Sequence, residues 1–359
     1  MRPSPTDLFA SARYYLYALD LDAGRADVLD VDRSFYSAPF LDQRALAGKR
    51  LGGWHYSLDE LLDAHARLTS IPATEQVAPG LRWIFHVGHC GSTLLSRLLD
   101  QLPDVLGIRE PLPLLALAEA SLRRADSAAR VAPLRVDAAL AMTADLLARG
   151  FAAPDRMVVK ATSTVSMLAP ALLASRVTDR AVLLELPLPR YLAAYLRDPA
   201  LRLQARSDAA PRLSARHEWT RDDTLALEHL DDAQCIALTW LVETERFARV
   251  AKDPAIATRV LRIDGDELVA HPAECLARAA QHLDLDASAD AITHAIAGDV
   301  LHRYAKQPGR TYDAGMRERD LAQAGERFAR EIRTATAWLR ALEAKLEGGT
   351  CAPAARGME

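Results

Sequence analysis

The stretch RWIFHVGHCGSTLLSRLLDQLPDVLGIREP, residues 82–111, decides the fold of this chain. Trp83 to Val87 form a short apolar run that predicts a buried strand, and Leu94 to Gln101 predict a helix. A glycine turn, residues 88–93, lies between them, and a second short strand follows and runs into Glu110. This order is typical of phosphate-binding loops, because glycines let the backbone approach an anion and the N–H groups at the helix start point at it.

The turn therefore predicts an anion cradle formed by six consecutive residues: Gly88, His89, Cys90, Gly91, Ser92 and Thr93. It is not a Walker A motif, because no lysine follows Gly91, and this disfavours the usual ATP or GTP chemistry. The alternative is that the turn only caps the helix and binds nothing. His86, His89 and Cys90 supply too few donors at useful spacing for a metal site, so we predict no metal.

Composition places the chain among ordinary globular proteins. It has 359 residues, 50% of them hydrophobic and 26% charged, with a formal net charge of -4. That charge gives no reason to expect a nucleic-acid partner, and no apolar run approaches the roughly 20 residues of a membrane span. The N-terminus lacks the apolar core of a signal peptide. Four scattered cysteines suggest neither a disulfide framework nor a metal site, so we expect a reducing, cytoplasmic location.

Strands alternate with helices from Leu81 onward. The predicted strands are short and rich in Val, Ile and Leu, which favours a central parallel sheet with helices on both faces. They cover residues 83–87, 105–108, 156–161, 181–186 and 259–263. The predicted helices cover residues 112–123, 137–149, 164–174, 189–197, 222–252, 272–282 and 319–347.

We predict three parts along the chain: an N-terminal appendage of unknown role (1–78), an α/β domain (79–315), and a C-terminal helix and tail (316–359). The appendage has the pattern of a small α+β segment. Residues 14–21 and 28–33 predict a hairpin, and Ser57 with Glu60 predicts a capping box at the start of a helix over residues 57–68.

Gly88, Glu110 and Lys160 each fall at or just after the C-terminal end of a predicted strand. Ligands of doubly wound sheets bind at this edge, so the three positions predict one crevice. Each has a purely structural alternative. Glu110 can stabilise a helix start, and Lys160 can form a salt bridge with Glu110 or Asp155. Cys90 is better explained as a small loop filler than as a nucleophile, because no base is paired with it.

With these features, the chain resembles the PAPS-dependent sulfotransferase family, as a divergent bacterial member. The resemblance rests on GHCGSTLLSRLL at 88–99, REP at 109–111, VVK at 158–160 and a later section, residues 235–285, and it covers about residues 81–310. It implies a P-loop-like fold and in-line transfer of a sulfuryl group from PAPS to an acceptor hydroxyl or amine, with no metal. The acceptor and the oligomeric state, including a homo-oligomer, stay open.

The resemblance also implies roles for particular residues. The loop 88–93 would hold the 5'-phosphosulfate, and Glu110 would take the acceptor proton. His89 stands where the family has a loop Lys or Arg and would stabilise charge on the bridging oxygen, while Lys160 would neutralise the leaving phosphate.

The chain departs from the family at the 3'-phosphate site, where Pro187 and Tyr195 replace the expected Arg and Ser. Arg190, Arg197 and Lys306 are the candidates to supply the missing cation. Two other classes therefore stay open. One is a binding protein that keeps the anion loop without donating sulfate, and the other is a transferase that uses a different nucleotide or phosphate donor.

Overall fold

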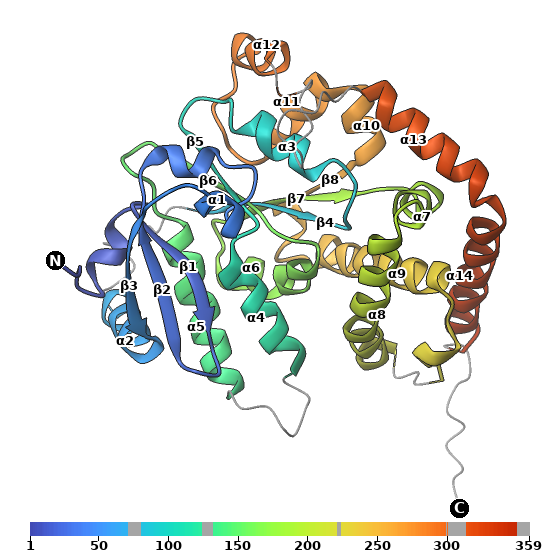
Figure 1. Cartoon of the computed structure of the whole chain (residues 1–359), viewed down its shortest axis with the longest axis horizontal. Coiled ribbons are helices and arrows are strands. Elements are labelled where there is room, and N and C mark those ends of the chain that lie inside the picture. The colour runs from blue at the N-terminus through green and yellow to red at the C-terminus, as the bar shows by residue number, and fades with distance from the viewer. Residues whose placement is uncertain (71–79, 124–131, 221–223, 299, 301–313, 350–359) are drawn as a thin grey trace, which may run out of the picture. The chain divides into compact units, whose positions relative to one another are not determined.

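The computed structural model describes residues 1–70, 80–123, 132–220, 224–298, 300 and 314–349 (Figure 1). The chain divides into two compact units. Unit 1 comprises Met1–Glu185 and Arg246–Ala314, and unit 2 comprises Leu186–Glu245 and Gly315–Glu359. The three-part division at residues 78/79 and 315/316 stays a prediction.

Unit 1 is built on a five-stranded parallel sheet. Its strands are β4 (Arg82–His86), β5 (Val105–Arg109), β6 (Arg156–Lys160), β7 (Arg180–Glu185) and β8 (Val260–Asp264). Their order across the sheet is β5-β6-β4-β7-β8, and every pairing is parallel. The predicted α/β class is therefore confirmed, and each predicted strand lies within one or two residues of its observed position. The first of these strands along the chain, β4, lies at the centre of the sheet, and every residue in it is buried.

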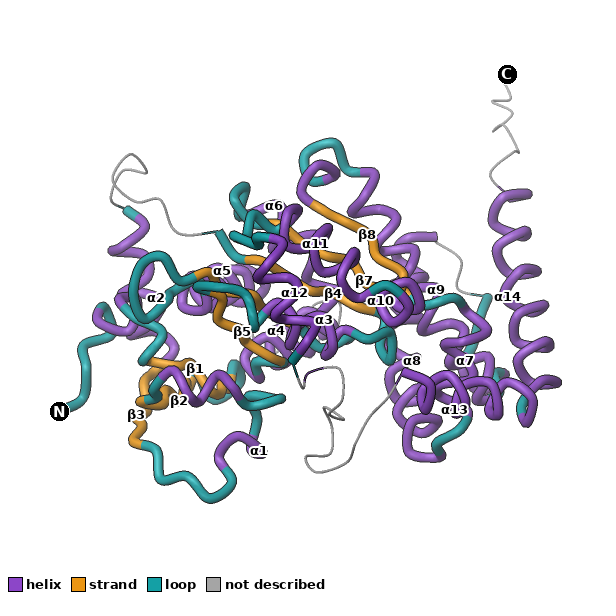
Figure 2. The backbone as a smooth tube through the Cα atoms, turned by 90° about the horizontal axis from the view of Figure 1, so that it is seen from above, coloured by secondary structure: helices purple, strands orange, loops and turns teal. Residues whose placement is uncertain are grey.

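Helices cover both faces of this sheet (Figures 1 and 2). On one face lie α3 (Ser92–Leu99), α10 (Gly265–Ala270), α11 (Pro272–His282) and α12 (Ala289–Ala297). On the other lie α4 (Leu112–Leu122), α5 (Pro133–Leu147) and α6 (Ala169–Ser175). The chain leaves β4 through the glycine turn directly into α3, so the turn lies at the carboxyl edge of the central strand.

The N-terminal segment forms a second, antiparallel sheet of β1 (Tyr14–Asp20), β2 (Arg25–Asp30) and β3 (Gly52–Ser57), in that order. The hairpin was predicted, but β3 was not. A short α1 (Gln43–Leu46) precedes β3, and α2 (Leu58–Thr69) follows it. The capping box between Ser57 and Glu60 is present, as predicted.

Arg109, the last residue of β5, fastens the N-terminal segment to the parallel sheet. Its side chain is buried, and its Nη1 donates to the carbonyl oxygens of Tyr36 at 2.7 Å and Ala38 at 2.9 Å. In return, the Leu41 N–H donates to the Arg109 carbonyl oxygen at 2.9 Å. Residues 36–41 are thus held directly beside the strand that ends in Glu110.

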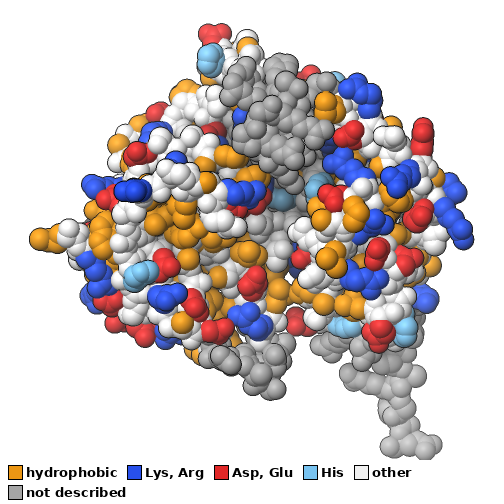
Figure 3. Space-filling model, viewed as in Figure 1, with side chains coloured by type: hydrophobic (Ala, Val, Ile, Leu, Met, Phe, Trp, Pro, Cys, Tyr) orange, Lys and Arg blue, Asp and Glu red, His pale blue; other side chains and the backbone are white. Residues whose placement is uncertain are grey.

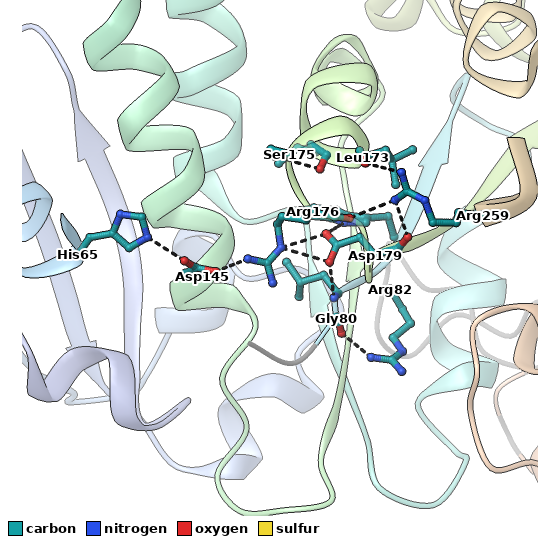
Figure 4. A network of polar contacts seen from close by, with 12 residues as sticks. His65, Gly80, Arg82, Asp145, Leu173, Ser175, Arg176, Asp179 and Arg259 are labelled. Carbon is teal, nitrogen blue, oxygen red and sulfur yellow. Dashed lines mark hydrogen bonds and ion pairs between the residues drawn. The ribbon is translucent and has the colours of Figure 1, made fainter. Parts of the chain in front are cut away.

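A polar network fixes the opposite, amino edge of the sheet (Figure 4). Asp179 precedes β7, and its buried carboxylate accepts from the Leu81 N–H and the Trp83 Nε1–H, each at 2.8 Å. Arg176 donates to the same carboxylate, and Arg259 Nη1 donates to the Asp179 carbonyl at 3.0 Å. Burial raises the pKa of the Asp179 carboxyl. The network holds the starts of β4, β7 and β8 together, which keeps their carboxyl ends aligned.

Unit 2 is helical and contains α7 (Leu188–Leu196), α8 (Pro199–Thr220), most of α9 (Asp232–Lys252), most of α13 (Ala314–Arg327) and α14 (Ala329–Gly349). Its described core has six members: Ala209, Leu213, Leu230, Cys235, Leu238 and Val242. Three helix predictions need correction. The helix α8 was missed, the helix predicted over 222–252 begins only at Asp232, and the helix predicted over 319–347 is two helices that meet at Phe328.

On the face drawn in Figure 3, basic and acidic side chains are interspersed over the described part of the chain. None of the described helices combines the length and the apolar character that crossing a membrane would require.

Candidate functional site

The glycine turn between β4 and α3 is tightly bent. Gly88 (φ 100°), His89 (φ 53°) and Gly91 (φ 89°) all have left-handed backbone conformations. Glycine adopts such angles without a Cβ clash, whereas His89 adopts them at a cost. Gly91 is the N-cap residue of α3, so the amides of the first helical turn begin directly after it. The turn is thus a glycine-bracketed bend that leads directly into a helix, and its role as an anion cradle stays a prediction.

His86, the last residue of β4, braces the start of this turn. Its Nε2 lies 2.8 Å from the Ala161 carbonyl oxygen, which can only accept, so Nε2 carries the proton. The other ring nitrogen, Nδ1, accepts from the Gly88 N–H at 3.1 Å. The Gly88 amide is therefore already paired, and an anion in the cradle has to rely on later amides and hydroxyls of residues 88–93.

Cys90 fills the inner side of the turn. The residue is completely buried, and its Sγ lies 3.5 Å from the Leu184 carbonyl oxygen. Burial raises the pKa of the Cys90 thiol to about 11, so the group is protonated at neutral pH. This agrees with a filling role. The backbone of α10 packs directly against the turn at Gly265. A side chain would not fit there, because a Cβ added to Gly265 would lie 2.2 Å from the Cys90 carbonyl oxygen.

Glu110 and Lys160 meet at the same edge of the sheet. Strands β5 and β6 pair in parallel with Arg109 opposite Lys160, and the Glu110 N–H donates to the Lys160 carbonyl oxygen at 2.7 Å. The Lys160 ammonium also forms an ion pair with Oε1 of Glu110. Asp155, the other partner considered for Lys160, pairs instead with Arg33 at 2.8 Å. The ion pair that the sequence allowed is therefore present.

The two partners differ in exposure. The Lys160 side chain is 2% exposed, whereas that of Glu110 is 24% exposed. Glu110 also has a positive φ of 56°, an uncommon conformation for a residue with a side chain. Such strain is often stored at functional sites. Two of the residues predicted to be catalytic, His89 and Glu110, are thus among the four described residues other than glycine with positive φ.

A continuous series of contacts joins the ion pair to the turn. Glu110 bonds to Lys160, the next residue Ala161 accepts from His86, and His86 accepts from Gly88. Ala161 also donates its N–H to the Ile84 carbonyl of β4 at 3.1 Å. The ends of β4, β5 and β6 therefore form one connected site, in which a carboxylate and a glycine turn have fixed relative positions.

Two of the remaining predicted residues belong to the other unit. Arg190 and Arg197 belong to unit 2, where Arg190 pairs with Glu318 at 2.6 Å and Arg197 with Asp320 at 3.4 Å. Lys306 lies outside the described residues. The structure thus brings together the loop, Glu110 and Lys160, and it gives the two arginines carboxylate partners on α13.

Pro187 and Tyr195, the two departures from the family pattern, both have structural roles in unit 2. Pro187 is the N-cap residue of α7. Tyr195 is 4% exposed, and its ring lies 4.6 Å from that of Tyr191. Neither residue offers an exposed donor for a phosphate.

The sequence interpretation missed His86 and Arg109 as parts of the site. Both are polar residues at the ends of apolar strands, and this is the same signal that drew attention to Lys160. Nothing in the local pattern indicated that Arg109 would hold residues 36–41. Within the described ranges, no group of three or more His, Cys, Asp or Glu residues is arranged to hold a metal ion.

No protein-family model matches the chain. No curated protein matches it either. Solved structures do. A sulfotransferase domain from the curacin biosynthetic pathway is 13% identical and covers 73% of this chain and 98% of its own, with a TM-score of 0.40. A sulfotransferase from Mycobacterium avium is 14% identical and covers 76% and 82%, also with a TM-score of 0.40.

A third solved structure is retinol dehydratase in a complex with retinol and PAP. It is 13% identical and covers 79% of this chain and 89% of its own, with a TM-score of 0.30.

Proposed function

We propose that this protein is a sulfotransferase that moves a sulfuryl group from PAPS to a hydroxyl or amine of an acceptor. The observation that carries the proposal is the connected series of contacts from Glu110 through Lys160, Ala161 and His86 to Gly88. It fixes a partly exposed carboxylate relative to a glycine turn that opens a helix. Sulfuryl transfer from a phosphosulfate anhydride needs these two elements: a cradle for the anionic donor and a base for the acceptor.

In the proposed reaction, the acceptor oxygen or nitrogen forms a bond to sulfur while the bond between sulfur and the bridging oxygen breaks. The acceptor proton passes to Glu110, and adenosine 3',5'-bisphosphate leaves. Residues 88–93 hold the phosphosulfate, and His89 stabilises the charge that develops on the bridging oxygen. His89 is part of the turn itself, where its backbone is left-handed.

Lys160 takes a positioning role in this scheme. Its side chain is almost fully buried, and its ammonium faces Oε1 of Glu110. This geometry favours orientation of the carboxylate over direct neutralisation of the leaving phosphate. Arg190, Arg197 and Lys306 stay our candidates for the 3'-phosphate. The cytoplasm stays the proposed location, and the free thiols of Cys90, Cys235 and Cys275 support it.

A binding protein without sulfotransferase activity is the second candidate. The observation that favours it is the burial of Tyr195 against Tyr191, which leaves no small hydroxyl at the position of the family's 3'-phosphate serine. In that case the turn would bind an anion, and Glu110 would have a structural role. A transferase with another phosphate donor is a further alternative, which dependence of turnover on Mg²⁺ would reveal.

Calorimetric titration with adenosine 3',5'-bisphosphate tests the proposal, with adenosine 5'-monophosphate and ATP as controls. We expect binding that requires the 3'-phosphate, followed by turnover when PAPS and a panel of hydroxyl and amine acceptors are supplied. Equal binding of all three nucleotides, or no binding, would contradict the proposal. Selective binding without turnover would favour the binding protein.

A further inference from the structure

Unit 2 contains two buried arginines on one face of α8. Arg212 and Arg216 are 4% and 0% exposed, respectively. Residues four apart in a helix lie on the same face. The same helix buries Ala209 and Leu213, which belong to the hydrophobic core of the unit. The two guanidinium groups therefore border an apolar core, where a charge is costly without a partner.

Arg212 has its partners. Its Nε donates to Oε1 of Glu243 at 2.9 Å, and its Nη1 donates to the Asp208 carbonyl oxygen at 3.1 Å. The Glu243 side chain is only 1% exposed, so the two charges form a buried pair. The first guanidinium is thus compensated inside the unit.

Arg216 is different. Its Nε, Nη1 and Nη2 are all buried, and none of them has a hydrogen-bond partner among the described residues. Asp208, the second carboxylate beside Arg212, stands two helical turns away, about 12 Å along the axis. A guanidinium stays protonated in proteins. Arg216 is therefore a buried positive charge without a hydrogen-bond partner in the described part of unit 2.

The buried atoms of the same helices that lack a hydrogen-bond partner among the described residues include two further guanidinium or hydroxyl donors. Nη2 of Arg212 and Oγ1 of Thr239 are buried without a partner among the described residues. Thr239 lies four residues before Glu243 on α9 and therefore shares its helix face. All of these groups can donate a hydrogen bond. An oxyanion would supply the acceptor that these donors lack.

We propose that unit 2 binds one small oxyanion, a phosphate, sulfate or carboxylate group, with Arg216 as the main ligand and Nη2 of Arg212 as a second donor. The planar fork of a guanidinium matches the oxygens of these groups better than a point charge does. Because Arg216 has no exposed surface, the anion is enclosed, and it enters during folding or through local opening of the helices. Arg212 and Arg216 belong to unit 2, whereas the glycine turn belongs to unit 1.

The test uses the full chain after exhaustive dialysis into chloride buffer. Thermal unfolding is then followed with added phosphate, sulfate or succinate at constant ionic strength, which distinguishes inorganic oxyanions from carboxylates. We expect at least one of them to raise the Tm by about 3 °C or more at saturation. Arg216→Met should abolish the rise. Arg206→Met, which removes an exposed arginine of the same helix, should respond like the wild type.

The stability without added anion gives a second readout. If Arg216 is uncompensated in the chain itself, Arg216→Met should melt at the same or a higher temperature than the wild type in chloride. A large fall in Tm of Arg216→Met in chloride, reproduced by the double variant Asp222→Asn and Asp223→Asn, would mean that the chain supplies its own partner for Arg216. Asp222 and Asp223 are tested because they are the first carboxylates after α8 in the sequence. This result would overturn the proposal. If Arg216→Met does not fold, Arg216→Gln replaces it.

Two more outcomes decide the matter. Release of about one phosphate, sulfate or carboxylate per chain from the acid-denatured wild type, measured by ion chromatography, would support the enclosed site. No release together with no rise in Tm for any anion would overturn it.

Arg216→Met should also keep its affinity for adenosine 3',5'-bisphosphate. Loss of that affinity would overturn a separate site, whereas failure of the wild type to bind this nucleotide would count only against the proposed sulfotransferase.

Discussion

Lys160 and Glu110 are joined at two levels: the Glu110 N–H donates to the Lys160 carbonyl oxygen at 2.7 Å, and the Lys160 ammonium pairs with the Glu110 carboxylate. The backbone contact continues the pairing of β5 with β6 by one residue. The side-chain contact holds a partly exposed carboxylate over a nearly buried ammonium. A single strand pairing thus sets the position of the proposed base.

Replacement of this base should separate chemistry from binding. We expect Glu110→Gln to lower turnover with PAPS by about 10²- to 10⁴-fold, because the amide cannot take the acceptor proton. The affinity for adenosine 3',5'-bisphosphate should change less than about threefold. Calorimetry and single-turnover assays measure the two quantities. Equal loss of both would mean that Glu110 supports the fold of the site and does not act as a base.

The unequal burial of the pair predicts an unequal cost of breaking it. Removal of Glu110 leaves the Lys160 ammonium buried without a counter-ion, whereas removal of Lys160 leaves a carboxylate that is 24% exposed to water. We expect Glu110→Ala to lower the free energy of unfolding by about 3 kcal/mol, and Lys160→Met to lower it by clearly less. Urea denaturation measures both. The double variant should be more stable than Glu110→Ala alone, and a lower stability would show that the pair is not coupled in this way.

The left-handed backbone of Gly91 makes the glycine turn sensitive to a single methyl group. Gly91→Ala forces a Cβ into φ 89° and places it 3.3 Å from the Leu268 side chain. We expect adenosine 3',5'-bisphosphate binding to weaken at least about tenfold as the amides move. Gly48→Ala is the matched control, since Gly48 has φ 74° with open space around it. Both variants should lose about 1 kcal/mol of stability. If they bind the nucleotide equally well, the turn is not the donor site.

His86 should matter for the turn even though it contacts no ligand in the proposed reaction. In His86→Phe the buried Gly88 N–H and Ala161 carbonyl lose their shared partner, which should cost about 2 kcal/mol of stability. The nucleotide affinity should fall as the turn loosens. His55→Phe, at an exposed histidine of β3, serves as the control. Unchanged unfolding curves for His86→Phe would argue against the bracing role.

Cys90 should resist alkylation in the folded protein. With a pKa raised to about 11 by burial, its thiolate is scarce at neutral pH, and the rate should grow only as the pH approaches that value. Peptide mapping after iodoacetamide treatment at pH 7 should leave Cys90 unmodified, whereas all cysteines react in urea. Stoichiometric labelling of Cys90 in the folded protein would restore its candidacy as a nucleophile.

The sequence was sufficient for the parallel sheet, because its strands are short apolar runs bounded by turns and buried on both faces. It was insufficient for β3, whose residues GGWHYS are mostly exposed and lack a clear alternation. The helix α8 was missed for a similar reason. It carries Pro211 in its interior and many charged residues, so only a narrow face, including Arg212 and Arg216, is buried.

The candidate site, too, could be predicted from the sequence only in part. Glu110, Lys160 and the turn follow strand ends, and the order of elements alone brings them to one edge. The bond from His86 to Ala161 depends on which strands are neighbours, and the carboxylate partners of Arg190 and Arg197 lie more than a hundred residues away in sequence. Contacts of this kind have no local signature.

The bonds from Arg109 to the backbone of Tyr36 and Ala38 also bear on how the molecule unfolds locally. The buried Nη1 of Arg109 cannot part from its two carbonyl acceptors without leaving donor and acceptors unsatisfied, so residues 36–41 and β5 should open as one cooperative unit in amide hydrogen exchange. The N-terminal segment is then a structural component of the strand that carries the proposed base. Deletion of the N-terminal segment should therefore make Glu110, which directly follows β5, less ordered.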